Sequence, residues 1–77
     1  MERDDWILEE NEKHFHHYGE DFNDEQLDWL GFIWDEYADE FGDIDWNRSG
    51  EHDTAWYILM SEVYGYDDET IDRYSEA

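Results

Sequence analysis

Residues 23–42, NDEQLDWLGFIWDEYADEFG, decide the fold, because their pattern is typical of one amphipathic helix with its own start and stop signals. At the start, Asn23 can accept a hydrogen bond from a first-turn amide, and Gln26 can reach back to the backbone of Asn23. At the other end, Gly42 is the residue type that commonly ends a helix in the left-handed conformation. The sequence therefore predicts a helix over the whole stretch.

This predicted helix has two chemically opposite faces, since successive side chains are about 100° apart. The apolar face, which we expect in the core, holds Leu27, Leu30, Ile33, Trp34, Tyr37 and Phe41. The acidic face holds Asp24, Asp28, Asp35, Glu36 and Asp39. Phe32 lies in the middle of the acidic face and Trp29 on its edge. A core does not require aromatic rings among carboxylates, so we interpret this face as a candidate binding surface.

Charge dominates the composition: 77 residues carry 25 acids against four Lys and Arg, for a formal net charge of -21. Such a balance is typical of disordered chains, because a polar chain buries too little surface to offset the entropy of ordering. However, five Trp, six Tyr and four Phe are spaced as apolar stripes. We therefore expect one folded acidic domain over residues 1–77, with a small core.

Cysteine is absent, so the chain has neither disulfides nor thiolate metal sites, which is compatible with a reducing cytoplasm. The first residues lack the basic and apolar regions of a signal peptide, and no segment approaches the roughly 18 apolar residues of a membrane span. We expect a cytoplasmic protein. Nucleic acid and anionic membranes would repel it, so its expected partners are basic proteins or cations.

Residues 4–18 predict a first amphipathic helix, which Gly19 ends. Its apolar face is expected to hold Ile7, Leu8, Asn11, Phe15 and Tyr18. On the same helical wheel His14 flanks this face, whereas Trp6 points elsewhere.

The connection over residues 42–50 is polar but contains Ile44 and Trp46, which we expect to tuck inward against the helices. From about residue 51 to residue 64 the chain predicts a third helix, which Gly65 ends. Its apolar face would hold Ala55, Trp56, Leu59, Met60 and Val63.

Residues 68–75 predict a short fourth helix with Asp67 as its cap. The sequence contains no Gly/Ser linker that would divide it. These elements predict an all-α fold, a small bundle of three helices plus a short C-terminal helix. The alternative is an α+β fold in which residues 54–60, TAWYILM, form a strand, because these side chains also suit a strand by propensity.

Catalytic motifs are missing from the sequence, which has no Gly-rich phosphate loop, nucleophile elbow or HExxH pattern. Its charge would also repel anionic substrates. We therefore expect a protein that is not an enzyme and uses no cofactor.

Two groups of residues are weak candidates for metal ligands. Glu10, His14 and His17 could converge on one helical face, but three loosely spaced ligands specify little, and surface histidines are the simpler interpretation. Asp43, Asp45 and Asn47 resemble the first ligands of an EF-hand loop. Arg48 stands where that loop turns at Gly, and Thr54 where it needs a bidentate Glu. No dedicated site is predicted, while weak divalent binding near the acids stays open.

A net charge of -21 exceeds what solubility requires, because a charge of about 2 to 8 suffices for a small domain. Acids one turn apart on a helix have β-carbons about 5 to 6 Å apart. Charges on a nucleic-acid strand recur on a similar scale, about 3.4 Å along the axis per phosphate. A rigid helix with a row of acids can therefore present itself to a protein built to grip phosphates.

In charge, composition and helical layout the whole chain resembles the small, acidic, aromatic-rich DNA-mimic proteins, many of them encoded by phages. Proteins of this class inhibit restriction enzymes, CRISPR effectors and other DNA-binding proteins. They share an arrangement of charge and no common fold or motif, so the resemblance assigns no individual residue.

The resemblance implies an inhibitor, a monomer or a homodimer, that binds the basic nucleic-acid groove of a target protein and blocks DNA binding by competition. Carboxylates of the acidic face would replace phosphates by pairing with Lys and Arg. Phe32 and Trp29 would supply an apolar anchor, because buried aromatic rings tend to carry affinity while rim charges raise the association rate.

Two other functions remain open. A halophilic or cation-binding protein would spread its acids evenly over the surface to hold hydrated cations. An antitoxin-like or chaperone-like protein would bind one basic protein without competing with DNA.

Overall fold

The computed structural model describes residues 2–47 and 52–75. Its elements are, in order, α1 Arg3–Tyr18, α2 Asp24–Tyr37, α3 Ala55–Ile58, the π-helical segment η1 Leu59–Val63, and α4 Asp68–Ser75. The prediction of an all-α fold is confirmed. The alternative strand over residues 54–60 is wrong, because the chain is helical from Ala55 onward.

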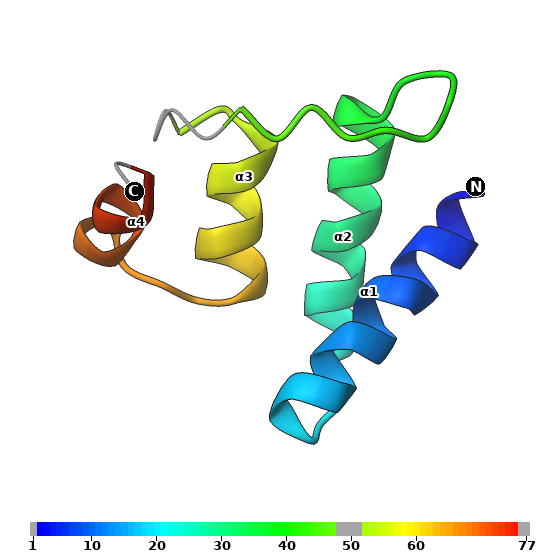
Figure 1. The fold of residues 1–77 in the computed structure, drawn as a ribbon, viewed down its shortest axis with the longest axis horizontal. Coiled ribbons are helices and arrows are strands. Elements are labelled where there is room, and N and C mark those ends of the chain that lie inside the picture. The colour runs from blue at the N-terminus through cyan, green and yellow to red at the C-terminus, as the bar shows by residue number, and fades with distance from the viewer. Residues whose placement is uncertain (1, 48–51, 76–77) are drawn as a thin grey trace.

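α2 is the central element of a flat molecule that measures 32 × 31 × 20 Å. It packs against α1, α3 and η1, whereas α4 packs against η1 at the edge. Figure 1 shows α2 beside α3 and antiparallel to it, with α1 crossing α2 obliquely. The helix with the clearest sequence pattern, α2, is therefore the one against which most of the other elements pack.

The start of α2 is capped as the sequence predicts. Asn23 Oδ1 accepts a hydrogen bond from the N–H of Gln26 at 2.8 Å, and Gln26 Oε1 accepts one from the N–H of Asn23 at 2.9 Å. Gln26 Nε2 also donates to the carbonyl of Val63 at 2.7 Å. One side chain therefore caps α2 and ties it to the end of η1.

The end of α2 differs from the prediction, because the helix ends at Tyr37 and not at residue 42. Ala38 is extended, with φ -79° and ψ 139°. The carboxylate of Asp39 accepts hydrogen bonds from the N–H groups of Phe41 at 2.8 Å and Asp43 at 3.0 Å. Aspartate competes in this way for backbone donors that a longer helix would use. The result is a tight turn in place of another helical turn.

Gly42 adopts the left-handed conformation expected of it, with φ +81°, but within this turn and not at the helix end. Phe41 was predicted to be buried and is 76% exposed, since the turn carries it away from α2. The chain then folds back, and Ile44 forms an isolated antiparallel bridge with Ala38. Ile44 and Trp46 pack against the core, as predicted.

The core is one cluster of buried side chains. Its buried members are Trp6, Phe22, Leu30, Ile33, Ala55 and Val63. The expectation that Trp6 points away is wrong: its ring centroid lies 5.7 Å from that of Trp34 and 6.4 Å from that of Trp46. The N-terminal half of α1 is thus anchored by indole rings from three segments, which meet at tilted angles.

The predicted apolar face of α1 is confirmed at Ile7, which packs against the core, but it is wrong for three of its other members. Leu8, Phe15 and Tyr18 are 65%, 49% and 51% exposed. α1 packs mainly on one neighbour, α2, so it can bury only one of two possible apolar faces. The face with the large Trp6 ring is buried, because it removes the most apolar area from water.

The third helix starts later than the prediction of residues 51–64, at Ala55, and residue 51 itself lies outside the described residues. Thr54 Oγ1 caps it by accepting from the N–H of Tyr57 at 3.1 Å. In η1 the backbone hydrogen bonds join residues five apart, as in a π-helix: the N–H of Tyr64 donates to the carbonyl of Leu59 at 3.0 Å. The predicted apolar face is confirmed, with Ala55, Trp56 and Val63 buried and Leu59 and Met60 half-buried.

Gly65 ends this helix with φ +73°, and α4 has the predicted bounds. Asp67 Oδ1 accepts a hydrogen bond from the N–H of Thr70 at 2.9 Å, which caps α4. Hydrogen bonds with Thr70 lower the pKa of Asp67 because they favour the charged carboxylate. Ile71 is fully buried and attaches α4 to the rest of the molecule.

Candidate interaction surface

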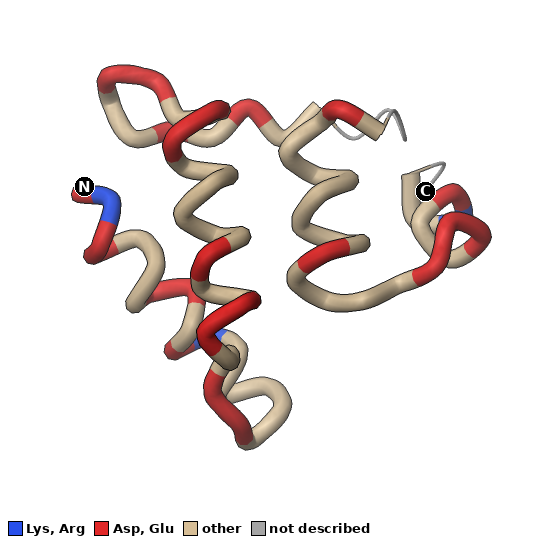
Figure 2. Tube along the Cα trace, turned by 180° about the vertical axis from the view of Figure 1, so that it is seen from behind, with Lys and Arg blue, Asp and Glu red and all other residues tan. Residues whose placement is uncertain are grey.

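One side of α2 carries exposed carboxylates, and Figure 2 shows acidic positions spaced along this helix. We call Asp24, Asp28, Asp35 and Glu36 the α2 acidic face. Phe32 lies on the same side and is 42% exposed. Its ring meets that of Trp29 edge to face, with centroids 5.6 Å apart. Because Trp29 packs against the core, it holds Phe32 in place from beneath.

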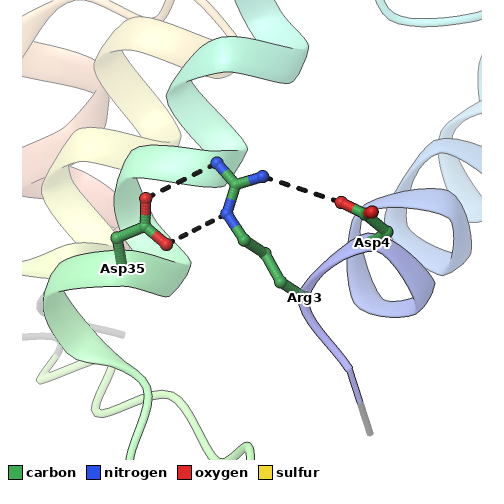
Figure 3. A network of polar contacts seen from close by, with 3 residues as sticks. All are labelled: Arg3, Asp4 and Asp35. Carbon is green, nitrogen blue, oxygen red and sulfur yellow. Dashed lines mark hydrogen bonds and ion pairs between the residues drawn. The ribbon is translucent and has the colours of Figure 1, made fainter.

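Asp35 differs from the rest of this face because it has an internal partner, shown in Figure 3. Arg3 donates from Nε to Asp35 Oδ1 at 2.9 Å and from Nη2 to Oδ2 at 3.5 Å. Nη1 of the same guanidinium lies 3.6 Å from Asp4 Oδ1. The side chains of Arg3 and Asp35 are 45% and 57% exposed, so water screens this pair.

Gly31 explains how the guanidinium reaches α2. A β-carbon at this position would lie 2.1 Å from Nη2 of Arg3, so the missing side chain leaves the space that Arg3 fills. This contact was not predicted. It joins the first turn of α1 to α2 across a separation of 32 residues, and no local pattern signals such a pair.

Asp24, Asp28 and Glu36 have no ion-pair partner in the part of the chain that the structure describes. By contrast, several acids of α1 face a cation: Lys13 Nζ lies 3.6 Å from both Glu9 and Glu10. The negative charge of α2 is therefore less compensated than that of α1.

Asp39 does not belong to the α2 acidic face, because it follows the helix end and holds the turn described above. Its placement in the predicted row is wrong. Its proposed contact with a partner stays a prediction, in which the carboxylate would keep its backbone hydrogen bonds and pair with a cation through its remaining lone pairs.

Acids also lie on α1, η1 and α4, whereas α3 carries none. Asp4 and Asp5 lie in the first turn of α1, Glu62 in η1, and Asp68 and Glu69 in the first turn of α4. Acids in a first turn face the positive end of a helix dipole and stabilise it. The α2 acidic face is distinguished by its aromatic centre and by three acids, Asp24, Asp28 and Glu36, that have no ion-pair partner within the described residues, and not by acidity alone.

A second region was not predicted: two adjoining hollows of about 260 Å³ each where the end of α1 meets the end of η1. Both are lined by His14, Tyr18 and Tyr64. The first is completed by Glu20, Gln26, Val63 and Tyr66, the second by Glu10, Lys13 and His17. A signal existed in the sequence, since the lining tyrosines flank the helix-ending glycines in Tyr18-Gly19 and Tyr64-Gly65-Tyr66.

His14 and the tyrosines of this region are held by specific contacts. His14 Nδ1 lies 2.7 Å from the carbonyl oxygen of Glu20, and because a carbonyl only accepts, Nδ1 is the donor. The His14 ring stacks on Phe22 with centroids 4.1 Å apart. Burial raises the pKa of Tyr64, and a hydrogen bond with Tyr18 raises that of Tyr66.

The metal-site candidates receive no support from the described residues, which contain no group of three or more His, Asp or Glu placed to share an ion. Glu10, His14 and His17 line one hollow without forming such a group. Asp43 and Asp45 are described, whereas Arg48 lies outside the described residues.

No protein-family model, curated protein or solved structure matches the chain. Within residues 2–47 and 52–75, none of the helices combines the length and the apolar character needed to cross a membrane.

Proposed function

We propose that the protein is a DNA-mimic inhibitor: it binds the basic nucleic-acid-binding groove of a target protein, such as a restriction enzyme or a CRISPR effector, and blocks DNA by competition. The α2 acidic face would meet the Lys and Arg side chains that normally hold phosphates. The proposal includes a cytoplasmic site of action and neither catalysis nor a cofactor.

The observation that carries this proposal is the position of Phe32. This ring is 42% exposed on α2, is supported by Trp29, and lies between Asp28 and Glu36, which have no ion-pair partner within the described residues. Leaving an aromatic ring in water costs hydrophobic free energy, which contact with a partner would recover. Interfaces commonly combine such a central aromatic anchor with a charged rim.

The α2 acidic face would act unevenly. Asp24, Asp28 and Glu36 are available to a partner, whereas Asp35 would have to exchange Arg3 for a partner's guanidinium. Exposed ion pairs contribute only about 0 to 1 kcal/mol, so this exchange would cost little free energy. Arg3 would then compete with an incoming cation and reduce the affinity slightly.

The halophilic or cation-binding function is the second candidate, and the presence of acids on α1, α2 and α4 favours it. The exposed apolar side chains oppose it. Leu8, Phe15 and Phe41 are each about half or more exposed, at 65%, 49% and 76%. Excluded salts strengthen the tendency of apolar groups to leave water, so such a surface suits molar salt poorly.

The test is a pull-down from bacterial lysate with the immobilised protein, repeated with competing duplex DNA and across a salt series. We expect one stoichiometric nucleic-acid-binding protein that is retained at about 0.2 M salt and displaced by DNA. The matched control is a triple variant, Asp24→Asn, Asp28→Asn and Glu36→Gln, which keeps the shape of the face and removes its charge.

Three other outcomes would contradict the proposal. Retention of one basic protein that DNA does not displace would favour an antitoxin-like or chaperone-like function. A mixture of basic proteins lost at about 0.2 M salt would show a non-specific polyanion. A fold that forms only in molar salt would favour the halophilic function.

A further inference from the structure

The first hollow has an unusual lining for so acidic a protein. It is formed by His14, Tyr18, Glu20, Gln26, Val63, Tyr64 and Tyr66, and has a volume of about 260 Å³. Glu20 is the only acid in this lining, and neither Lys nor Arg contributes to it. The lining thus combines the rings of His14 and three tyrosines with one acidic residue, which is the chemistry of a site for an organic cation.

The polar groups of the lining are already positioned. Gln26 donates to the carbonyl of Val63 and is thereby fixed. His14 donates from Nδ1 to the Glu20 carbonyl, which fixes the orientation of its ring. The carboxylate of Glu20 takes part in no ion pair or hydrogen bond within residues 2–47 and 52–75. A cation would therefore find acceptors without displacing an internal donor.

The aromatic rings are close enough to act together. The centroids of Tyr64 and Tyr66 are 6.2 Å apart with their planes 21° from parallel, and those of His14 and Tyr18 are 4.8 Å apart. A cation within about 6 Å of a ring centroid is attracted by its π-electrons, and several rings add their effects.

We propose that this hollow is a receptor for one arginine side chain of the basic partner, bound between the tyrosine rings and the carboxylate of Glu20. The guanidinium is planar, stacks on rings and is more weakly hydrated than an ammonium, so it suits an aromatic site better than lysine does. The inference rests on the proposed function for the source of the arginine. It adds a second, specific contact at the end of α1, away from the α2 acidic face.

The neighbouring hollow is a poorer candidate, because Lys13 belongs to its lining and would repel a cation. An anionic ligand fits neither hollow. In the first, it would meet the Glu20 carboxylate and the field of a chain with a formal net charge of -21.

The experiment uses the free protein, so it does not depend on knowing the partner. N-acetyl-arginine methylamide is titrated while the ring signals of Tyr18, Tyr64 and Tyr66 are followed by NMR. Parallel titrations use N-acetyl-lysine methylamide, tetramethylammonium chloride and sodium chloride. We expect saturable shifts with the arginine compound, stronger binding than with the other cations, and upfield shifts of its side-chain protons over the rings.

Two pairs of variants locate the binding. Tyr66→Leu should weaken binding of the arginine compound about threefold to tenfold, whereas Tyr57→Leu, which alters a ring outside the lining, should not. Glu20→Gln should weaken it as well, whereas Glu25→Gln removes an equal charge from another exposed position and should not. If Tyr66→Leu failed to fold, the two glutamate variants would still decide.

The proposal is overturned if the arginine compound gives no saturable shift or acts no differently from sodium chloride. Tighter binding of tetramethylammonium would also overturn it and point to a free quaternary ammonium ligand. Failure of this inference and failure of the proposed function are distinguishable. If the pull-down captures a target that DNA displaces but the free protein does not bind the arginine compound, only the arginine receptor is ruled out. If the arginine compound binds but no such target is captured, only DNA mimicry is ruled out.

Discussion

α1 and α2 are both amphipathic helices with an exposed phenylalanine, yet the sequence predicts the buried face of α2 correctly and that of α1 wrongly. α2 packs against α1, α3 and η1, and its apolar stripe has only one possible orientation. α1 packs mainly on α2 and carries apolar side chains on two sides, Trp6 on one and Leu8 with Phe15 on the other. When a helix has one neighbour, that neighbour decides which stripe is buried.

The largest effect should come from the buried side of α1. Trp6→Ala removes a ring that is 7% exposed and contacts two other indoles, so we expect a loss of about 3 to 5 kcal/mol in the free energy of unfolding. The matched change on the opposite side is Leu8→Ala, at a residue 65% exposed, with an expected change within about 0.5 kcal/mol. Urea denaturation measures both. Equal losses would mean that α1 buries both stripes in solution.

The next effect compares the exposed rings of the two helices. Phe32 on α2 and Phe15 on α1 are 42% and 49% exposed, so truncating either should cost little stability. Under the proposed function, Phe32→Ala should speed dissociation from the target roughly tenfold with little change in association. Phe15→Ala should leave both rates unchanged. Surface plasmon resonance with the captured target measures both rates for each variant. Faster dissociation of Phe15→Ala, with Phe32→Ala unchanged, would place the binding face on α1.

Parts of the fold that depend on neighbouring residues were predictable from the sequence, and parts that depend on competing or distant contacts were not. The cap of α2, its buried Leu30 and Ile33, and the bounds of α4 follow from local patterns, because each depends on residues within a few positions. The early end of α2 depends on Asp39, whose carboxylate competes for backbone donors. The spacing of apolar residues gives no sign of this competition.

The candidate site is predictable to a similar degree. The exposure of Phe32 among acids follows from helix periodicity alone. The pairing of Arg3 with Asp35 and the hollow between Tyr18 and Tyr66 depend on how α1 and η1 lie against their neighbours. Contacts of this kind are set by tertiary packing, which a single sequence does not specify.

A smaller effect concerns the contact between the two compared helices. Gly31→Ala places a methyl group where the Arg3 guanidinium lies, so Arg3 must move and Asp35 loses its partner. Alanine is favoured over glycine inside a helix by about 1 kcal/mol, while an exposed ion pair contributes about 0 to 1 kcal/mol. We expect a net stabilisation of a few tenths of a kcal/mol. We also expect faster association with the target, because Asp35 is freed.

The control for this substitution is Arg3→Gln, which frees Asp35 without changing helix propensity at residue 31. It should speed association as Gly31→Ala does but give no stabilisation. If neither variant altered association, Asp35 would not belong to the binding face.

The smallest effect lies away from both helices, at the attachment of α4, where Tyr57 donates a hydrogen bond to Asp68. This bond, with smaller effects of desolvation and nearby carboxylates, raises the pKa of Tyr57 above its ordinary value of 10.0. A raised folded-state pKa gives stability that is fully present below the unfolded pKa and is lost as pH rises through the folded pKa. The raised pKa values of Tyr64 and Tyr66 act in the same direction.

Stability, measured by urea denaturation from pH 8 upward, should therefore fall once pH passes about 10. Tyr57→Phe should flatten part of this fall, because the phenyl ring cannot ionise beside Asp68. Asp67 gives the opposite dependence at low pH: its lowered pKa contributes stability that is present above the unfolded pKa and lost as pH falls through the folded pKa. Asp67→Asn keeps an acceptor for the Thr70 N–H without the charge and should reduce that loss. An alkaline profile unchanged by Tyr57→Phe would show that the hydrogen bond between Tyr57 and Asp68 does not contribute to the attachment of α4.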